Sequence, residues 1–134
     1  MMVSLAAVIL TAAFQAGPAT PAATKACLHQ AGSESPEQQL RKRQALGLAR
    51  TINSAEAAFR VKAGTGRYGD LNQLVSHDFL KPAPDGGQYV PGFAVRLDLT
   101  EEGYWFAVVD TTDACGFRFI SNQDGLILTA QPIQ

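Results

Sequence analysis

The most constraining feature of the sequence is one amphipathic segment, which runs from Ser35 to Gly64 and reads SPEQQLRKRQALGLARTINSAEAAFRVKAG. It opens with the pattern of a capping box, since Ser35 precedes Pro36 at the first helical position and Gln38 follows three residues later. Apolar side chains then recur at helical spacing, at Leu40, Ala45, Leu48, Ile52, Ala55 and Phe59. We therefore predict one long helix that ends at Gly64, whose apolar stripe the rest of the chain must cover.

A helix of this length would span about 40 Å at the usual rise per residue. That is longer than a domain of about 100 residues is wide. Two outcomes are open: the first turns project beyond the domain, or the helix breaks near Gly47. A glycine inside a helix costs about 1 kcal/mol relative to alanine, which makes a break at this position physically reasonable.

The segment after the long helix predicts one more short helix. Asp70 is a favourable cap for residues Leu71 to Val75, with Gln73 in the reciprocal position of a capping box. The following stretch from Lys81 to Gly92, KPAPDGGQYVPG, is rich in proline and glycine and predicts a surface loop.

From Phe93 onward the apolar period changes from helical spacing to two. Residues Phe93 to Leu99 alternate, and Tyr104 to Val109 are apolar on both faces, as expected for a central strand. Two more strands are predicted at Phe117–Ile120 and Leu126–Thr129, joined by the Asp-Gly turn at Asn122–Gly125. The predicted fold class is α+β, with a long N-terminal helix packed on a small antiparallel meander of about four strands.

The N-terminal 34 residues have the composition of an export signal followed by a linker. Residues 1–16, MMVSLAAVILTAAFQA, are apolar, uncharged and shorter than the ~20 residues of a membrane span. Residues 17–34 are rich in small residues and proline and predict a flexible tether. We expect a signal peptide at 1–16, a domain at 35–134, a periplasmic or extracellular location and no transmembrane span after the leader is removed. The alternative is a buried N-terminal helix of a cytosolic protein.

Two cysteines, Cys27 and Cys115, agree with export. In an oxidising compartment we expect them to form one disulfide, which would close a long loop and contribute on the order of 4 kcal/mol. Two unpaired thiols are the alternative.

Charge and aromatic patterns suggest a protein partner rather than nucleic acid. The formal net charge is −1 and no long basic block is present, which disfavours nucleic-acid binding. The basic run of Arg41, Lys42 and Arg43 is either a partner-binding patch or the solvated face of the helix. In the run Tyr104, Trp105, Phe106 at least one side chain must point away from the helix. It is either a docking surface or is covered by the proline-rich loop.

Several motifs together resemble the globular domains of type IV pilin-like proteins and type II secretion pseudopilins. The string LARTINSAE at 48–56 is followed by Phe59 and by the spaced pattern Gly66, Tyr68, Gly69, Asp70, Leu71, Leu74. The aromatic strand YWFAVV at 104–109 and the hairpin GFRFISNQDGLI at 116–127 resemble the final strands of that family. The resemblance covers roughly residues 41 to 129 and implies a pilin-like fold and a role in protein–protein contact.

One family motif is missing from the sequence. Pilins begin with a Gly-Phe-Thr-Leu-x-Glu cleavage site that leads directly into an apolar helix, and this chain carries a conventional leader and a proline-rich tether instead. We therefore expect an exported relative of the pilin globular domain rather than a subunit packed in a filament by the usual apolar helix.

Reactive side chains form no catalytic motif in the sequence, so we predict no enzymatic activity and no cofactor. The sequence has no Gly-x-Ser-x-Gly elbow, and its two histidines, His29 and His77, lack further ligands at zinc spacing. Late loops could hold calcium, as the resemblance to pseudopilins also implies; the candidate ligands are Asp110, Asp113, Asn122 and Asp124. Ordinary turn chemistry explains the same residues, and we favour that reading.

These observations lead to two hypotheses about function. The first is an exported, non-enzymatic, pilin-like interaction protein associated with a secretion or surface apparatus. The alternative is a small periplasmic binding module or inhibitor that reuses the same fold.

Overall fold

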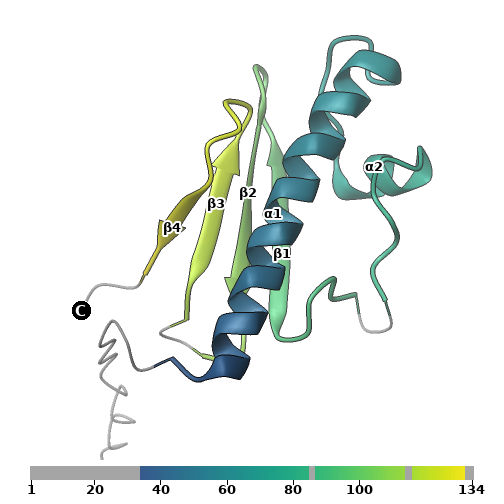
Figure 1. Ribbon diagram of the computed structural model, residues 1–134. Coiled ribbons are helices and arrows are strands. Elements are labelled where there is room, and N and C mark those ends of the chain that lie inside the picture. Colours follow the sequence, from purple (N-terminus) through teal and green to yellow (C-terminus); the bar gives the residue numbers. More distant parts are fainter. Residues whose placement is uncertain (1–33, 85–86, 114–115, 132–134) are drawn as a thin grey trace, which may run out of the picture.

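The structure is a computed structural model that describes residues 34–84, 87–113 and 116–131. Two helices precede four strands: α1 (Pro36–Lys62), α2 (Leu71–Ser76), β1 (Phe93–Leu99), β2 (Tyr104–Asp110), β3 (Arg118–Asn122) and β4 (Leu128–Ala130). The strands form one antiparallel sheet in the order β1-β2-β3-β4, and both helices lie on the same side of it (Figure 1). The prediction of an α+β domain with a helix packed on a four-stranded antiparallel meander is confirmed.

Helix α1 begins at the predicted cap. The Ser35 hydroxyl accepts a hydrogen bond from the backbone N–H of Gln38 at 3.2 Å, and the Gln38 side chain accepts from the N–H of Ser35 at 2.8 Å. The helix is continuous through Gly47, so of the two outcomes that the sequence left open, the break near that residue does not occur. It ends at Lys62, where the next N–H, from Ala63, still donates to the carbonyl of Phe59.

The core lies between α1 and the sheet, with a second cluster under α2. The helix contributes the stripe that its spacing predicts, including Ala45, Leu48, Ile52, Ala55 and Phe59, all of them buried. Helix α2 has the predicted capping box between Asp70 and Gln73, and it adds Leu74 to a smaller cluster around Phe59. The proline-rich loop also contributes to the core, because Val90 is only 7 % exposed.

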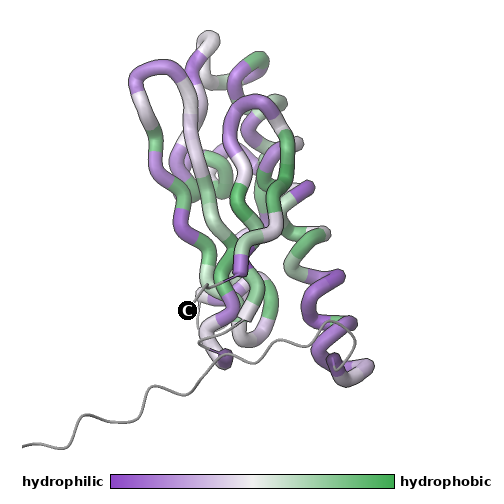
Figure 2. The backbone as a smooth tube through the Cα atoms, turned by 90° about the vertical axis from the view of Figure 1, so that its left-hand side faces the viewer, coloured by the Kyte–Doolittle hydropathy of each residue, from purple (hydrophilic) through white to green (hydrophobic). Residues whose placement is uncertain are grey.

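The sheet has one face against α1 and one face away from it. Alternate residues of the paired strands point to opposite faces, and the buried ones on the α1 side are Phe93, Tyr104, Phe106, Val108 and Phe119. Figure 2 looks from the side of β4 and shows the helix and the sheet as two separate layers. We call the other side, which carries Ala94, Arg96, Trp105, Ala107, Val109, Ile120 and Leu128 at successive register positions, the outer face.

Several predictions concern residues that the structure does not describe. The expected signal peptide at 1–16, nearly all of the tether at 17–34, and the cysteines Cys27 and Cys115 lie outside the described residues. Within the described ranges, neither helix combines the length and apolar character that crossing a membrane would need.

Candidate functional site

The most unusual polar group of the described residues is the carboxyl of Glu56, on the face of α1 that meets the sheet. Its side chain has no solvent exposure. One oxygen, Oε2, accepts a hydrogen bond from the backbone N–H of Gly69 at 3.0 Å. The other, Oε1, is buried and has no hydrogen-bond partner among the described residues. A buried polar atom without a partner costs about 1–3 kcal/mol, so this position is energetically expensive.

The environment of Glu56 favours its neutral form. Burial raises the pKa of this carboxyl from 4.5 to about 7, because a charge loses its hydration there; the hydrogen bond from Gly69 lowers the pKa and the charge of Asp70 raises it. The acid therefore titrates near neutral pH instead of staying ionised as a surface glutamate would.

Close packing holds the Gly69 backbone against α1. A Cβ atom added at Gly69 would lie 2.9 Å from Cε1 of the Phe59 ring, closer than such atoms pack. The Phe59 ring also makes edge contacts with His77 and Phe79, whose centroids lie 5.5 and 5.8 Å away. Glycine at position 69 thus permits the loop to approach Phe59 while its N–H reaches Glu56.

A second polar cluster joins α1 to the end of the β3–β4 hairpin. The hydroxyl of Tyr104 donates to Oδ1 of Asn53 at 2.8 Å, and the amide of Asn53 donates to the hydroxyl of Ser121 at 2.9 Å. Ser121 in turn donates to the carbonyl of Leu126 at 2.8 Å. Burial, the charge of Glu56 and the neighbouring Tyr68 raise the pKa of Tyr104 above its ordinary value. The cluster contains no free nucleophile, because each hydroxyl already donates to a fixed oxygen.

Glu56 is fully buried among the residues that the structure describes. A small hollow of about 170 Å³ lies nearby, between the loop at 66–68 and the β1–β2 turn at 99–103. Its lining includes Arg60, Arg67 and Tyr68 but not Glu56. Ligand pockets usually measure about 300–1,000 Å³, so this hollow is smaller than a typical one. The contact that the structure gives the Glu56 carboxyl is the hydrogen bond from Gly69, which ties the loop after α1 to the helix.

The structure separates the three members of the predicted basic patch. Arg41 lies 3.4 Å from the carboxylate of Asp110 and donates to the hydroxyl of Thr112 at 2.9 Å. Lys42 pairs with Glu34 at 3.4 Å and lies 3.3 Å from the centre of the Phe117 ring. Arg43 is exposed and forms no ion pair within the described ranges. Two of the three cations are therefore used within the domain, and Arg43 alone keeps the character of a contact residue.

The predicted aromatic patch divides between the two faces of the sheet. Tyr104 and Phe106 are only 3 % and 0 % exposed and point toward α1, so the prediction that they form a contact surface is wrong for both. Trp105 lies on the outer face, half-buried, with the guanidinium of Arg96 5.2 Å from its ring. Strand alternation explains the division, because neighbouring residues of a strand point in opposite directions.

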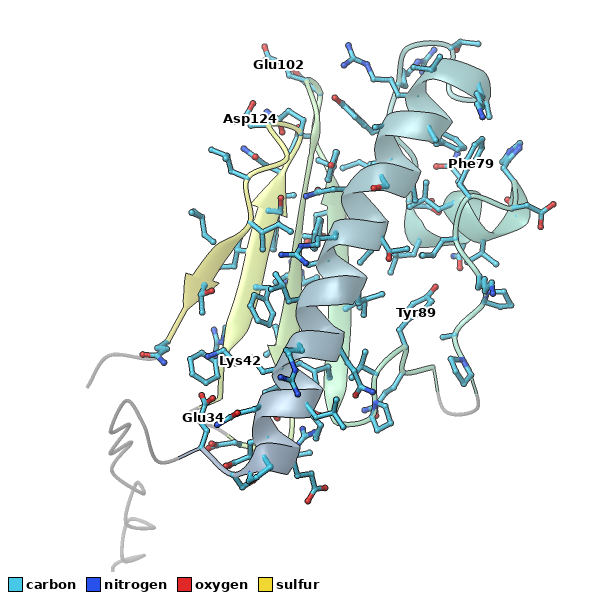
Figure 3. The ribbon with its side chains drawn as sticks, viewed as in Figure 1. Glu34, Lys42, Phe79, Tyr89, Glu102 and Asp124 are labelled. Atoms are coloured by element: carbon cyan, nitrogen blue, oxygen red, sulfur yellow. The ribbon has the colours of Figure 1, made fainter. Side chains whose placement is uncertain are left out.

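The four candidate calcium ligands do not form one site. Asp110 is the last residue of β2 and Asp113 follows that strand, whereas Asn122 lies at the opposite end of the β2–β3 pair, opposite Trp105. Figure 3 labels Asp124 at that second end, beside Glu102 and far from Glu34 and Lys42. Oδ1 of Asp110 accepts from the backbone N–H of Thr112, and Asn122 and Asp124 bond each other within the turn. These contacts are the ordinary turn chemistry of Asp and Asn.

Reasoning from the sequence missed Glu56 as a distinctive residue. The available signal was a single carboxylate at a helical position next to Ala55 and between Ile52 and Phe59, all on the apolar stripe. A charged residue on an apolar stripe indicates either that the stripe has been assigned wrongly or that the acid is buried.

Comparisons of this chain with protein-family models, with curated proteins and with solved structures gave no match.

Proposed function

We propose that this chain is an exported, non-enzymatic, pilin-like interaction protein that works in or beside a secretion or surface apparatus. The observation that carries the proposal is the arrangement of surfaces. A 27-residue helix covers one face of the meander, while no described helix or strand covers the outer side of the helix or the outer face of the sheet (Figure 1). The distinctive titratable group, Glu56, is sealed inside.

Two of the motifs that resemble pilin-like proteins lie on α1 and on the loop between α1 and α2. In the string LARTINSAE, Leu48, Ile52 and Glu56 point into the core. The spaced glycine and tyrosine pattern forms the loop that returns from α1 to α2, with Gly69 buried. In a pilin-like domain the corresponding string on the long helix would also face the sheet. This agreement in position supports the pilin-like part of the proposal.

The outer side of α1 is the contact surface that we propose for a foreign partner. Arg43 and Arg50 are exposed and lie two turns apart on the solvent side of the helix. Neither forms an ion pair within the part of the chain that the structure describes. Because cations without an internal partner attract acidic surfaces, the partner that fits best is a protein with an acidic patch.

Capture from envelope extracts tests this proposal. The affinity-tagged full chain should retain a defined envelope protein, and the double variant Arg43→Glu/Arg50→Glu should lose it. Lys81→Glu is the control, since Lys81 is exposed on the loop after α2 and the substitution also reverses a positive charge. Equal retention by all three proteins would exclude the helix surface, and recovery of the chain only from the cytosol would exclude the exported role.

The alternative, a small periplasmic binding module or inhibitor, has one observation in its favour. The hollow between the loop at 66–68 and the β1–β2 turn has both cationic and acidic residues around it, including Arg67, Glu101 and Glu102. A shift in the melting temperature with a small zwitterionic ligand, abolished by Arg67→Ala, would favour this alternative.

A further inference from the structure

The C-terminal strand β4 is an edge strand with unusual exposure. Within the described residues it pairs only with β3, through three residue pairs that end at Ala130. Leu128, the first residue of β4, is 64 % exposed, and Leu126, which lies just before the strand, is 70 % exposed. An edge strand with an exposed leucine, and a second one just before it, is the kind of edge on which another strand can add.

This edge also lacks the charges that usually protect an edge strand. Residues 125–131 read GLILTAQ and contain no Lys, Arg, Asp or Glu. Natural sheets discourage strand addition with charged side chains, especially lysine, and with prolines or bulges on their edges. None of those features occurs from Gly125 to Gln131.

The opposite edge of the same sheet is protected. Strand β1 carries Arg96 and Asp98 on the outer face, joined by an ion pair of 2.7 Å. Their side chains are 71 % and 40 % exposed, and Arg96 also covers the ring of Trp105. A strand added to β1 would have to accommodate these charges, whereas a strand added to β4 would not.

We propose that the occupant of the β4 edge is the β4 strand of a second copy of this chain, in antiparallel pairing. A two-fold axis perpendicular to the sheet would join the two four-stranded sheets into one. Leu128 of each copy would then lie on the same side of the joined sheet. The uncharged strand matches itself, because pairing a copy with itself places no like charges opposite each other.

The difference between the two edges selects this closed pair over an open chain of copies. Addition of β4 onto β1 of the next copy would repeat without end, since each copy would keep one free edge of each kind. It would also place Leu128 beside the Arg96–Asp98 pair. Pairing of β4 with β4 avoids those charges and uses the β4 edge of each copy, which closes the pair.

The short edge implies a weak, reversible dimer. Standard interfaces bury about 800 Å² per partner, and a strand of this length with two leucines supplies less than that. The inference goes beyond the proposed function, because it concerns a second copy and not a foreign protein.

Sedimentation velocity of the purified full chain, over a wide range of concentration, tests the inference. The sedimentation coefficient should rise with concentration from that of the monomer to that of the dimer. Leu128→Lys and Leu128→Glu should each remain monomeric, because like charges would meet across the two-fold axis. An equimolar mixture of these two variants should recover the dimer, since opposite charges then meet. Val61→Lys is the matched control, because Val61 is 82 % exposed on α1, and it should dimerise as the unchanged chain does.

Several results would overturn the inference. They are an unchanged chain that stays monomeric at every concentration, a Leu128→Lys variant that dimerises normally, a Val61→Lys variant that does not, and a mixture that fails to recover the dimer. Circular dichroism checks that the variants fold. Leu126→Lys, at an even more exposed position, serves as the second variant if Leu128→Lys proves unstable.

Discussion

The backbone N–H of Gly69 donates to Oε2 of Glu56 at 3.0 Å, while Oε1 of the same carboxyl is buried with no partner in the part of the chain that the structure describes. This one contact ties the loop after α1 to the middle of the core. It also places an ionisable group where its charged form is poorly stabilised, so the stability of the domain should depend on pH in a predictable direction.

Stability should fall as the pH rises from about 4.5 to about 7. The pKa of Glu56 is about 7 in the folded chain against 4.5 for the ordinary group, so in this window the folded state holds a proton that the unfolded state has released. At about 1.4 kcal/mol per pH unit, the total loss is roughly 3 kcal/mol, and it levels off above pH 7. Urea unfolding at pH 5 and pH 8 measures it. Glu56→Gln cannot ionise and should remove most of this difference; an identical pH dependence in both proteins would contradict the assignment.

Gly69→Ala should destabilise the domain, whereas Gly47→Ala should not. The added methyl at position 69 would lie 2.9 Å from the buried Phe59 ring, and overpacking of this kind costs about 1–3 kcal/mol. At Gly47 nothing lies within 4 Å of the new atom, and alanine in a helix is better than glycine by about 1 kcal/mol. Thermal unfolding of the two variants should therefore shift in opposite directions, and shifts of the same sign would show that the packing at Phe59 is looser.

Arg41→Ala should destabilise the domain by about 1 kcal/mol, a typical value for a partly exposed ion pair with an added hydrogen bond. Arg41 connects the first turns of α1 to Asp110 and Thr112, and its guanidinium also lies 5.4 Å from the centre of the Phe93 ring. Chemical denaturation at low and high salt measures the effect, which should shrink as salt screens the pair. Arg43→Ala, two residues away and without such contacts, should stay within about 0.5 kcal/mol of the unchanged chain. Equal effects of the two substitutions on stability would contradict the assignment of a stabilising role to Arg41 and not to Arg43.

Asn53→Ala should cost about 2–3 kcal/mol, because it leaves the buried hydroxyl of Tyr104 and the hydroxyl of Ser121 without their shared partner. Amide hydrogen exchange around Leu126 should accelerate at the same time, since Asn53 also holds the carbonyl of Gly125 at 3.3 Å. Ser54→Ala is the adjacent control; this exposed hydroxyl donates only to the carbonyl of Arg50 within its own helix. If the two substitutions had the same effect on exchange, the cluster would not be what fastens the hairpin.

Local structure followed closely from the sequence. The capping boxes at Ser35 and Asp70 are present, and the strands start within two residues of their predicted positions. These features depend on residues close in sequence: a cap needs a side chain three positions from its N–H, and a hairpin needs its turn residues. The order of the strands followed too, because short loops connect neighbours in an antiparallel meander.

The tertiary structure decided which way individual side chains point and which residues they contact. Strand β2 is apolar on both faces, so its pattern could not show that Tyr104 points toward α1 and Trp105 away from it. Arg41 and Arg43 are equally basic in the sequence, yet only Arg41 lies within reach of Asp110, 69 residues further along the chain.

By itself the sequence determined where helices and strands begin, how they alternate and which stripe of α1 is apolar. The tertiary structure alone decided that Glu56 loses its water, that Gly69 becomes its partner and that β4 pairs, within the described residues, only with β3. The physical reason is that backbone hydrogen bonds and periodicity are set by near neighbours in the chain. Burial, and with it the pKa of an acid or the exposure of a leucine, is set by what distant segments bring against it.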